Sequence, residues 1–200
     1  MNRSIISLWQ LLCLALSINA QDSIFLSKDT LLPNPTSMVY FKGDTIIIVN
    51  SSNQVINGIL LKDTYLWTGR RLVLFKGGKS VVFDKKGNVT SAYLAERTVL
   101  WTGYQSLTFM SDSKVLFNSE GALIQGELSR DQELDIRGEK IVFRRAEPIV
   151  FDDFGNVLKG QIDKREHLMN YQGKVKAYKA GTILFFNEKT EVIGGEEEEE

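Results

Sequence analysis

The chain has 200 residues, of which 43% are hydrophobic, and its 24 lysines and arginines nearly balance its 25 aspartates and glutamates. This composition excludes a collagen, a disulfide-rich miniprotein and a wholly disordered chain. The length suits a single domain with a sizeable core, because domains commonly have about 100 to 200 residues.

Residues 1–20 have the pattern of a secretory signal peptide. Arg3 gives a positive start, residues 8–16 are mostly apolar, and Ala20 is a small residue suited to cleavage. We therefore expect an exported protein, located in the periplasm, at the cell surface or outside the cell. No later segment approaches about 18 consecutive apolar residues, so we expect no transmembrane segment.

Cys13 is the only cysteine and lies within this leader. The rest of the chain therefore offers no disulfide, thiolate metal site or cysteine nucleophile. A lipoprotein signal would place the cysteine at the cleavage site, but Leu12 stands where a small residue is expected. Cleavage after Ala20 is the favoured interpretation.

A repeat of 34 residues runs through residues 21–195. One column of the repeat is aromatic: Phe41, Phe75, Phe109, Phe143 and, after one inserted residue, Tyr178. A second column is leucine: Leu32, Leu66, Leu100, Leu134 and Leu168. A third is small: Gly58, Ala92, Gly126, Gly160 and Gly195. A fourth marks turns: Asn53, Gly87, Gly121 and Gly155.

The pattern inside each unit is that of β-hairpins rather than helix pairs. Short apolar runs such as residues 46–49 and 81–83 are bounded by glycine, asparagine or aspartate. In one unit we expect strands at 72–75, 80–83 and 89–94, followed by a connection at 95–103. Each unit is then a three-stranded meander, and the whole chain has about fifteen strands.

A lone meander cannot bury its apolar face, so neighbouring units are expected to stack. A propeller blade needs about 40 residues or more, and outer-membrane strands need about nine to eleven residues. The sequence therefore predicts an all-β fold, an elongated antiparallel β-solenoid or rolled meander of about five 34-residue hairpin repeats. The domains are the signal peptide 1–20, one β-repeat domain 21–195 and an acidic disordered tail 196–200.

The repeat unit, exemplified by residues 58–66, resembles the hairpin repeats of secreted bacterial proteins of unassigned role and, more loosely, MORN-type repeats. This resemblance implies a scaffold or binding surface rather than a reaction. The chain lacks the Tyr-x-Gly-x-Trp core of MORN units, so membrane or lipid binding is not carried over.

Charge argues against nucleic acid as a partner. Without Arg3 and the five terminal glutamates, the 24 basic and 25 acidic residues become 23 and 20. The 23 basic residues form no cluster or stripe in the sequence, and binding to nucleic-acid phosphates requires clustered cations.

Catalytic and metal-binding groups are scarce. His167 is the only histidine, so neither a triad nor a three-ligand zinc site can form. Asp152 aligns with Asn50, Asp84, Asn118 and Asn187 as the first residue of a turn, and is interpreted as a turn residue. The carboxylates that could pair for glycosidase-type acid–base catalysis are Asp152 with Asp153, and Asp131 with Glu133 and Asp135, but this chemistry is not favoured. Calcium binding at Asp152 or Asp153 is not favoured either, because the spacing of a calcium loop is absent. We predict no enzyme activity, cofactor or metal.

The aromatic residues Tyr65, Trp67, Trp101 and Tyr104 are the partner-binding candidates. Trp67 and Trp101 share one repeat position, and the favoured interpretation is that they pack between repeats. If they point outward, they form a ladder that can stack on sugar rings or a protein. We expect a non-enzymatic structural or protein-interaction module of a bacterial cell envelope. The alternative is a carbohydrate- or cell-wall-binding module, with an envelope polysaccharide as the partner.

Overall fold

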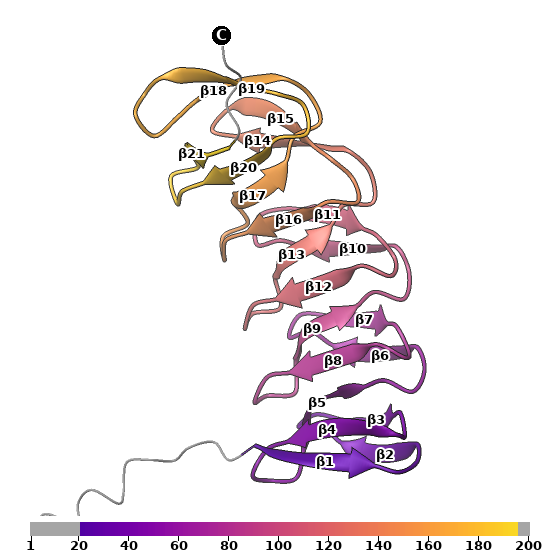
Figure 1. Cartoon of the computed structure of the whole chain (residues 1–200). Helices are drawn as coiled ribbons and strands as arrows, with labels where there is room; N and C mark the ends of the chain where they lie inside the picture. The colour runs from indigo at the N-terminus through magenta and orange to yellow at the C-terminus, as the bar shows by residue number, and fades with distance from the viewer. Residues whose placement is uncertain (1–20, 196–200) are drawn as a thin grey trace, which may run out of the picture.

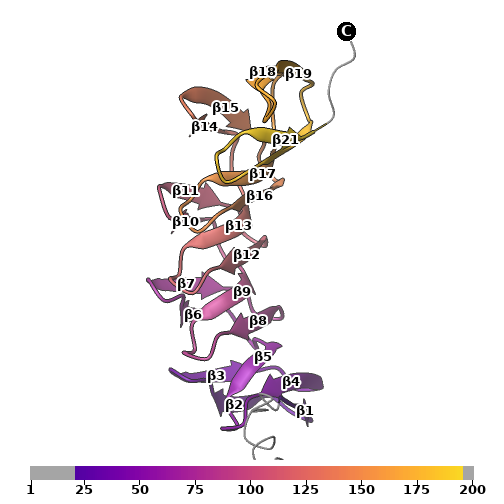
Figure 2. The same ribbon diagram turned by 90° about the vertical axis from the view of Figure 1, so that its left-hand side faces the viewer.

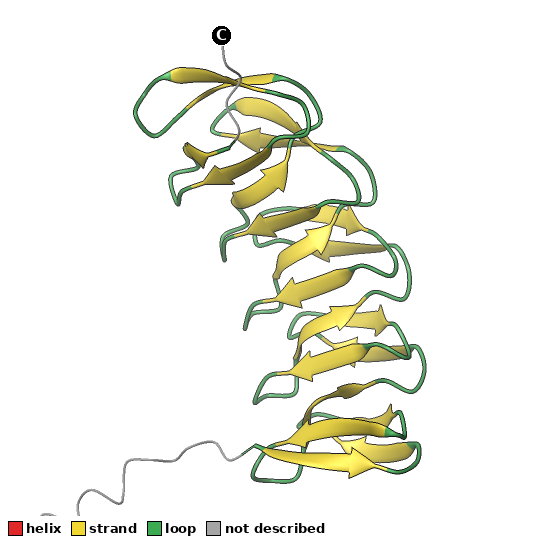
Figure 3. Cartoon of the chain, viewed as in Figure 1, coloured by secondary structure: helices red, strands yellow, loops and turns green. Residues whose placement is uncertain are grey.

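The computed structural model describes residues 21–195, and every regular element within them is a β-strand (Figures 1 and 3). The predicted all-β class is therefore confirmed. The predicted signal peptide, residues 1–20, and the acidic tail, residues 196–200, lie outside the described residues.

Eleven strands form one long antiparallel sheet that meanders along the molecule (Figure 1). In spatial order they are β1 (Asp22–Leu26), β4 (Thr45–Val49), β5 (Val55–Ile59), β8 (Ser80–Phe83), β9 (Val89–Tyr93), β12 (Lys114–Phe117), β13 (Leu123–Glu127), β16 (Pro148–Phe151), β17 (Val157–Gln161), β20 (Ile183–Phe186) and β21 (Val192–Gly194).

Between these strands the chain leaves the long sheet to form five separate two-stranded hairpins. They are β2 (Thr30–Pro33) with β3 (Met38–Phe41), β6 (Thr64–Trp67) with β7 (Leu72–Phe75), β10 (Thr98–Trp101) with β11 (Ser106–Phe109), β14 (Gln132–Ile136) with β15 (Glu139–Phe143), and β18 (Glu166–Met169) with β19 (Val175–Tyr178). Figures 1 and 2 show the hairpins stacked along one side of the long sheet, which makes the molecule elongated.

Each unit contributes four strands rather than the three expected, and the described chain has 21 strands instead of about fifteen. The segment interpreted as a connection, residues 95–103, contains strand β10. Its sequence Thr-Val-Leu-Trp hides the alternation, because three consecutive residues are apolar although only Leu100 is buried.

The predicted solenoid is wrong. All pairs of named strands are antiparallel, and the long sheet stays open with β1 and β21 at its edges. Tight turns join neighbouring strands within each layer, and short connections carry the chain from the long sheet to each hairpin and back, so the chain does not wind into coils (Figure 1). The hairpins cannot form a second continuous sheet, because β6 pairs with β7 alone among the named strands and the other hairpins do likewise.

The core lies between the long sheet and the hairpins. The aromatic column and most of the leucine column are buried there, and the four phenylalanines of the column are no more than 1% exposed. The small column makes room for the aromatic one: a Cβ on Gly126 would come within 2.8 Å of Phe109 Cδ1. The repeat period therefore reflects ring-against-backbone packing that recurs within each unit.

The turn residues behave as predicted. Gly87, Gly121 and Gly155 have φ values of 85°, 73° and 87°. Asp84 Oδ1 accepts hydrogen bonds from the N–H groups of Lys86 and Asn88, each 2.8 Å long. The Asp/Asn column thus satisfies the turn backbone, and it explains these side chains without a catalytic role.

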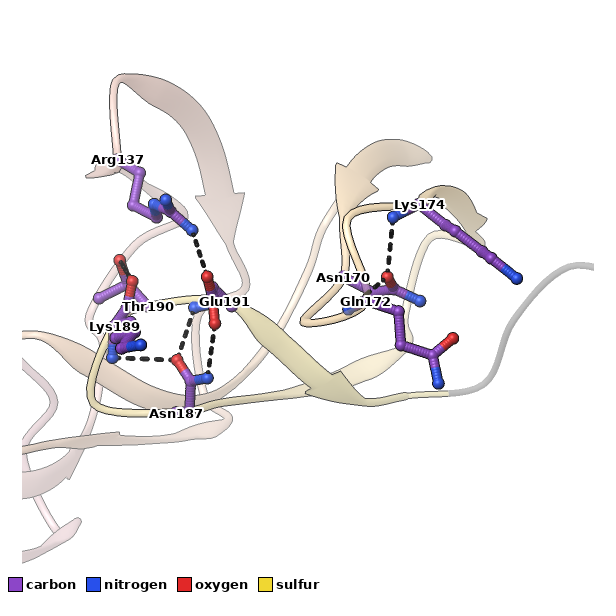
Figure 4. A network of polar contacts seen from close by, with 8 residues as sticks. All are labelled: Arg137, Asn170, Gln172, Lys174, Asn187, Lys189, Thr190 and Glu191. Carbon is purple, nitrogen blue, oxygen red and sulfur yellow. Dashed lines mark hydrogen bonds and ion pairs between the residues drawn. The ribbon is translucent and has the colours of Figure 1, made fainter.

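Turns of the two layers also touch one another. The hydroxyl of Thr36 donates to the Gly87 carbonyl, 51 residues later, at 3.3 Å. Near the other end, the Arg137 guanidinium reaches the Glu191 carboxylate, 54 residues later, at 3.2 Å (Figure 4). A hairpin turn therefore braces a long-sheet turn about one and a half repeats further along.

Candidate functional site

The residues considered for catalysis lie on different elements, and the aspartates among them have structural partners. Asp152 Oδ1 accepts from the Phe154 and Asn156 N–H groups, and Asp153 accepts from the Asn118 amide at 2.8 Å. His167 is exposed on β18, opposite Ala177. Within residues 21–195 no three histidine, cysteine or acidic side chains come together as metal ligands.

The acidic residues at 131–135 likewise serve the hairpins. Asp131 Oδ1 accepts from the Arg145 N–H at 2.8 Å. Asp135 accepts from the Gly138 N–H at 2.7 Å and lies 3.2 Å from the Lys140 ammonium. The Gly138 N–H and, second, the Lys140 ammonium hold the pKa of Asp135 below its usual range. An acid kept ionised in this way is not a proton donor near neutral pH.

Tyr65 and Trp67 lie on the outward side of strand β6. Leu66 between them is buried at 4% exposure, whereas Tyr65 is 63% and Trp67 is 43% exposed. Alternation along a strand requires this arrangement, because successive side chains point to opposite faces. The expectation that Trp67 packs between repeats is therefore wrong. It failed because the equivalent segment of the next unit, residues 95–103, was interpreted as a connection rather than a strand.

Trp101 occupies the same register position on β10 and is half-buried. The guanidinium of Arg70, from the β6–β7 turn, covers its ring at 5.7 Å from the centroid. Arg71 Nη1 donates to the Val99 carbonyl at 3.1 Å. These two contacts place Trp67 and Trp101 on neighbouring hairpins that are held together through side chains.

Tyr104 does not belong to the same strand face. It lies in the β10–β11 turn, is 74% exposed, and has its backbone against Gly155 of a long-sheet turn. The structure therefore brings Tyr65, Trp67 and Trp101 onto one side of the hairpin layer and leaves Tyr104 at its rim.

Further apolar residues on this side were missed by the sequence reasoning. We define the hairpin face as the outward residues of the first three hairpins. They are Leu31, Pro33, Met38, Tyr40, Tyr65, Trp67, Leu72, Leu74, Val99, Trp101, Ser106 and Thr108. None of them is charged, and the first seven of them, with Val99 and Ser106, are exposed. Alternation along the sequence did not mark them, because inward and outward positions are both apolar in strands such as Met38–Phe41 and Leu72–Phe75.

The hairpin face ends at the fourth hairpin. The outward positions there are Glu133, Asp135, Lys140 and Val142, so the same register positions become mostly charged. The chemical character of the hairpin layer thus changes from apolar to ionic between β11 and β14.

A small pocket of about 180 Å³ lies at the C-terminal end of the molecule. Its lining is mainly apolar and includes Ile136, Leu168 and Phe186. Beside it, the Asn187 amide donates to Glu191 at 2.9 Å (Figure 4). This hydrogen bond and the Arg137 guanidinium lower the pKa of Glu191. Its lining also includes Glu139 and Thr190, whose hydroxyl donates to the Lys189 carbonyl at 2.7 Å, and we assign the pocket to the packing of the last repeat.

No protein-family model matches the chain, and no curated protein matches it. Within residues 21–195 no helix is long and apolar enough to cross a membrane.

Proposed function

We propose that the chain is a non-enzymatic, exported repeat protein that acts as a structural or protein-interaction module of a bacterial cell envelope. In this proposal the hairpin face is the partner-binding surface, and the long sheet holds the hairpins in register. The observation that carries the proposal is the uncharged, largely apolar and exposed character of the hairpin face over three consecutive hairpins.

The composition of the hairpin face favours a protein partner. Protein interfaces are enriched in aromatic residues and methionine and depleted of charge at their centres. Tyr40, Tyr65, Trp67 and Met38 supply these residue types, and the charged fourth hairpin supplies a polar rim. Exposed apolar residues gathered in this way commonly mark interaction sites.

A carbohydrate partner is the second candidate, since Trp67 and Trp101 occupy equivalent positions on neighbouring hairpins. Aromatic rings one repeat apart suit stacking on successive sugar rings. Arg70 over Trp101 and the aliphatic Leu72 beside Trp67 suit this candidate less well, because they interrupt the aromatic surface.

The test places a photoreactive amino acid at position 67 and, as a control, at the equivalent position 135. In intact envelopes, position 67 should yield one abundant protein adduct that is lost in the double variant Tyr65→Ser/Leu72→Ser. The matched variant Glu133→Ser/Lys140→Ser should leave the adduct unchanged. Equal labelling at both positions would contradict the proposal, and retention on envelope polysaccharide without a protein adduct would favour the carbohydrate reading.

Export is tested separately by sequencing the amino terminus of the protein recovered from envelopes. Arg3, the apolar residues 8–16 and Ala20 support cleavage after Ala20. The recovered chain should therefore begin at Gln21. An intact Met1 on protein retained in the cytoplasm would refute export.

A further inference from the structure

The two edges of the long sheet differ in their ability to accept another strand. At one edge, β21 has only three residues. In the preceding repeat, Lys159, Gly160 and Gln161 of β17 pair with the next strand, β20. The residue of β21 that corresponds to Lys159 is Gly194, and β21 ends there. The residues that would pair with a further strand are thus almost entirely missing from β21.

The opposite edge, β1, is extended and open. Strand β5 is the equivalent of β1 one repeat later, and its partners on this side show which groups of β1 face the edge. Asn57 of β5 pairs with Ile48. The Ile59 carbonyl accepts from the Lys42 N–H at 2.9 Å, and the Leu61 N–H donates to the Tyr40 carbonyl at 3.0 Å.

The corresponding residues of the first repeat are Ser23, Phe25 and Ser27, and β4 is the only strand paired with β1 among the described residues. Their N–H and C=O groups therefore face a free edge. Strand β1 has no lysine, proline or bulge, the devices that commonly protect sheet edges.

Apolar side chains gather at this edge. Phe25 and its cross-strand neighbour Ile46 are each 63% exposed. Ile24 stands in the small-residue column, where glycines such as Gly58 contact a phenylalanine that lies earlier in the chain, here Phe41. Leu32 is only partly buried, although its four equivalents are buried. The core is therefore uncovered where the first repeat has no predecessor.

We propose that this edge is covered by a second copy of the chain, with β1 pairing antiparallel to β1 about a two-fold axis at Phe25. In this register Phe25 lies opposite Phe25 of the second copy, and Ser23 lies opposite Ser27. Ile24 lies opposite Leu26, and Asp22 lies nearest to Lys28, which is in the bend that follows β1. The groups that face the free edge, those of Ser23, Phe25 and Ser27, are the ones that hydrogen-bond across the axis.

Charge complementarity supports this occupant. The exposed Asp22 and Lys28 are opposite in sign, and the two-fold axis forms their pair twice. A head-to-tail contact is disfavoured, because the other edge ends at Gly194. Pairing therefore closes as a dimer with one continuous sheet of twice eleven strands, and it does not propagate into a fibre.

Disulfide trapping tests the register in the full chain carrying Cys13→Ser. In the proposed pairing the two Phe25 Cα atoms are about 5.5 Å apart, which suits a disulfide. The Phe25→Cys variant should therefore form a linked dimer on mild oxidation. Ile24→Cys should link at least about tenfold more slowly, because its two Cα atoms lie diagonally at about 7–8 Å. Ile193→Cys, exposed at the other edge, is the control. Equal rates in all three would overturn the proposal.

Sedimentation velocity tests the association itself. The wild-type protein should sediment at twice the mass of a single chain. Phe25→Pro should sediment as a monomer, because proline lacks the N–H that faces the free edge, while the pairing with β4 is kept. Phe25→Lys should also sediment as a monomer, because the two lysines would repel each other across the axis. Since lysine keeps the backbone N–H, this variant controls for a folding defect caused by proline. If the wild type sediments as a monomer, the proposal is refuted, whether residues 1–20 or a separate peptide cover β1. The proposal is also refuted if Phe25→Pro and Phe25→Lys each still sediment as a dimer.

Discussion

The guanidinium carbon of Arg70 lies 5.7 Å from the ring centroid of Trp101, so a turn of one hairpin covers an aromatic side chain of the next. Replacing Arg70 with alanine should expose Trp101 and lower stability by only about 0.5–1 kcal/mol, the usual size of an exposed cation–π contact. Iodide quenching of tryptophan fluorescence should increase. Arg97→Ala, in an exposed loop, is the control, and unchanged quenching in Arg70→Ala would show that Arg70 does not shield the ring.

The adjacent residues Leu66 and Trp67 should respond oppositely to truncation. Leu66 is buried in the core, so Leu66→Ala should cost about 2–5 kcal/mol. Trp67 points outward, and Trp67→Ala should cost less than about 1 kcal/mol. Urea unfolding of the two variants measures the difference. Similar losses for both would place Trp67 in the core and remove it from the hairpin face.

Gly121 tests the contact between the turns of the two layers. Both Gly121 and Gly138 have positive φ, but a Cβ on Gly121 would meet the backbone of Thr68 and Arg70, whereas a Cβ on Gly138 would meet open space. Alanine at either position carries the strain of a left-handed residue, about 1 kcal/mol. Gly121→Ala should therefore be more destabilising than Gly138→Ala in thermal unfolding. Equal losses would mean that the turns do not brace each other.

Glu191 should make the C-terminal repeat sensitive to acid. Its pKa is held below 4.5, first by the Asn187 amide and then by the Arg137 guanidinium. Because the folded-state pKa is lowered, the ionised carboxylate stabilises the fold above pH 4.5, and this stability is lost as the pH falls through the folded-state value.

Glu191→Gln should therefore lower the urea midpoint at neutral pH, and the difference from the wild type should shrink as the pH falls through the folded-state pKa. Glu188→Gln, exposed in the same turn, should match the wild type at every pH value. A midpoint difference for Glu191→Gln that stays constant with pH would contradict the assigned role of the carboxylate.

The repeat period and turn chemistry were predictable because each leaves a local mark in the sequence. Phe109 and Gly126 recur with their equivalents because a ring packs on a bare backbone, and Asp84 recurs because its carboxylate serves the turn. Whether successive hairpins share one sheet depends on pairing between distant strands. The sequence of a single unit does not specify it, and the solenoid expectation failed for this reason.

The candidate site was only partly predictable, because the sequence shows which residues are aromatic but not whether they are exposed. Tyr65 and Trp67 stood out as aromatic residues, but their exposure depended on recognising Thr64–Trp67 as a strand. The contribution of Leu31 and Tyr40 required knowledge that the first hairpin stacks beside the second, which only the fold supplies. The open edge at β1 is visible only once the order of the strands is known.

Oxidative footprinting tests most directly whether the hairpin face binds an envelope partner. Tyr65 and Trp67 should be labelled strongly in the purified protein and at least about fivefold less in intact envelopes, since a stable interface buries on the order of 800 Å² on each partner. Tyr171, which is 57% exposed in the β18–β19 turn outside the hairpin face, should be labelled equally in both samples. Strong labelling of Tyr65 and Trp67 in envelopes, at the level of Tyr171, would contradict the proposed binding surface.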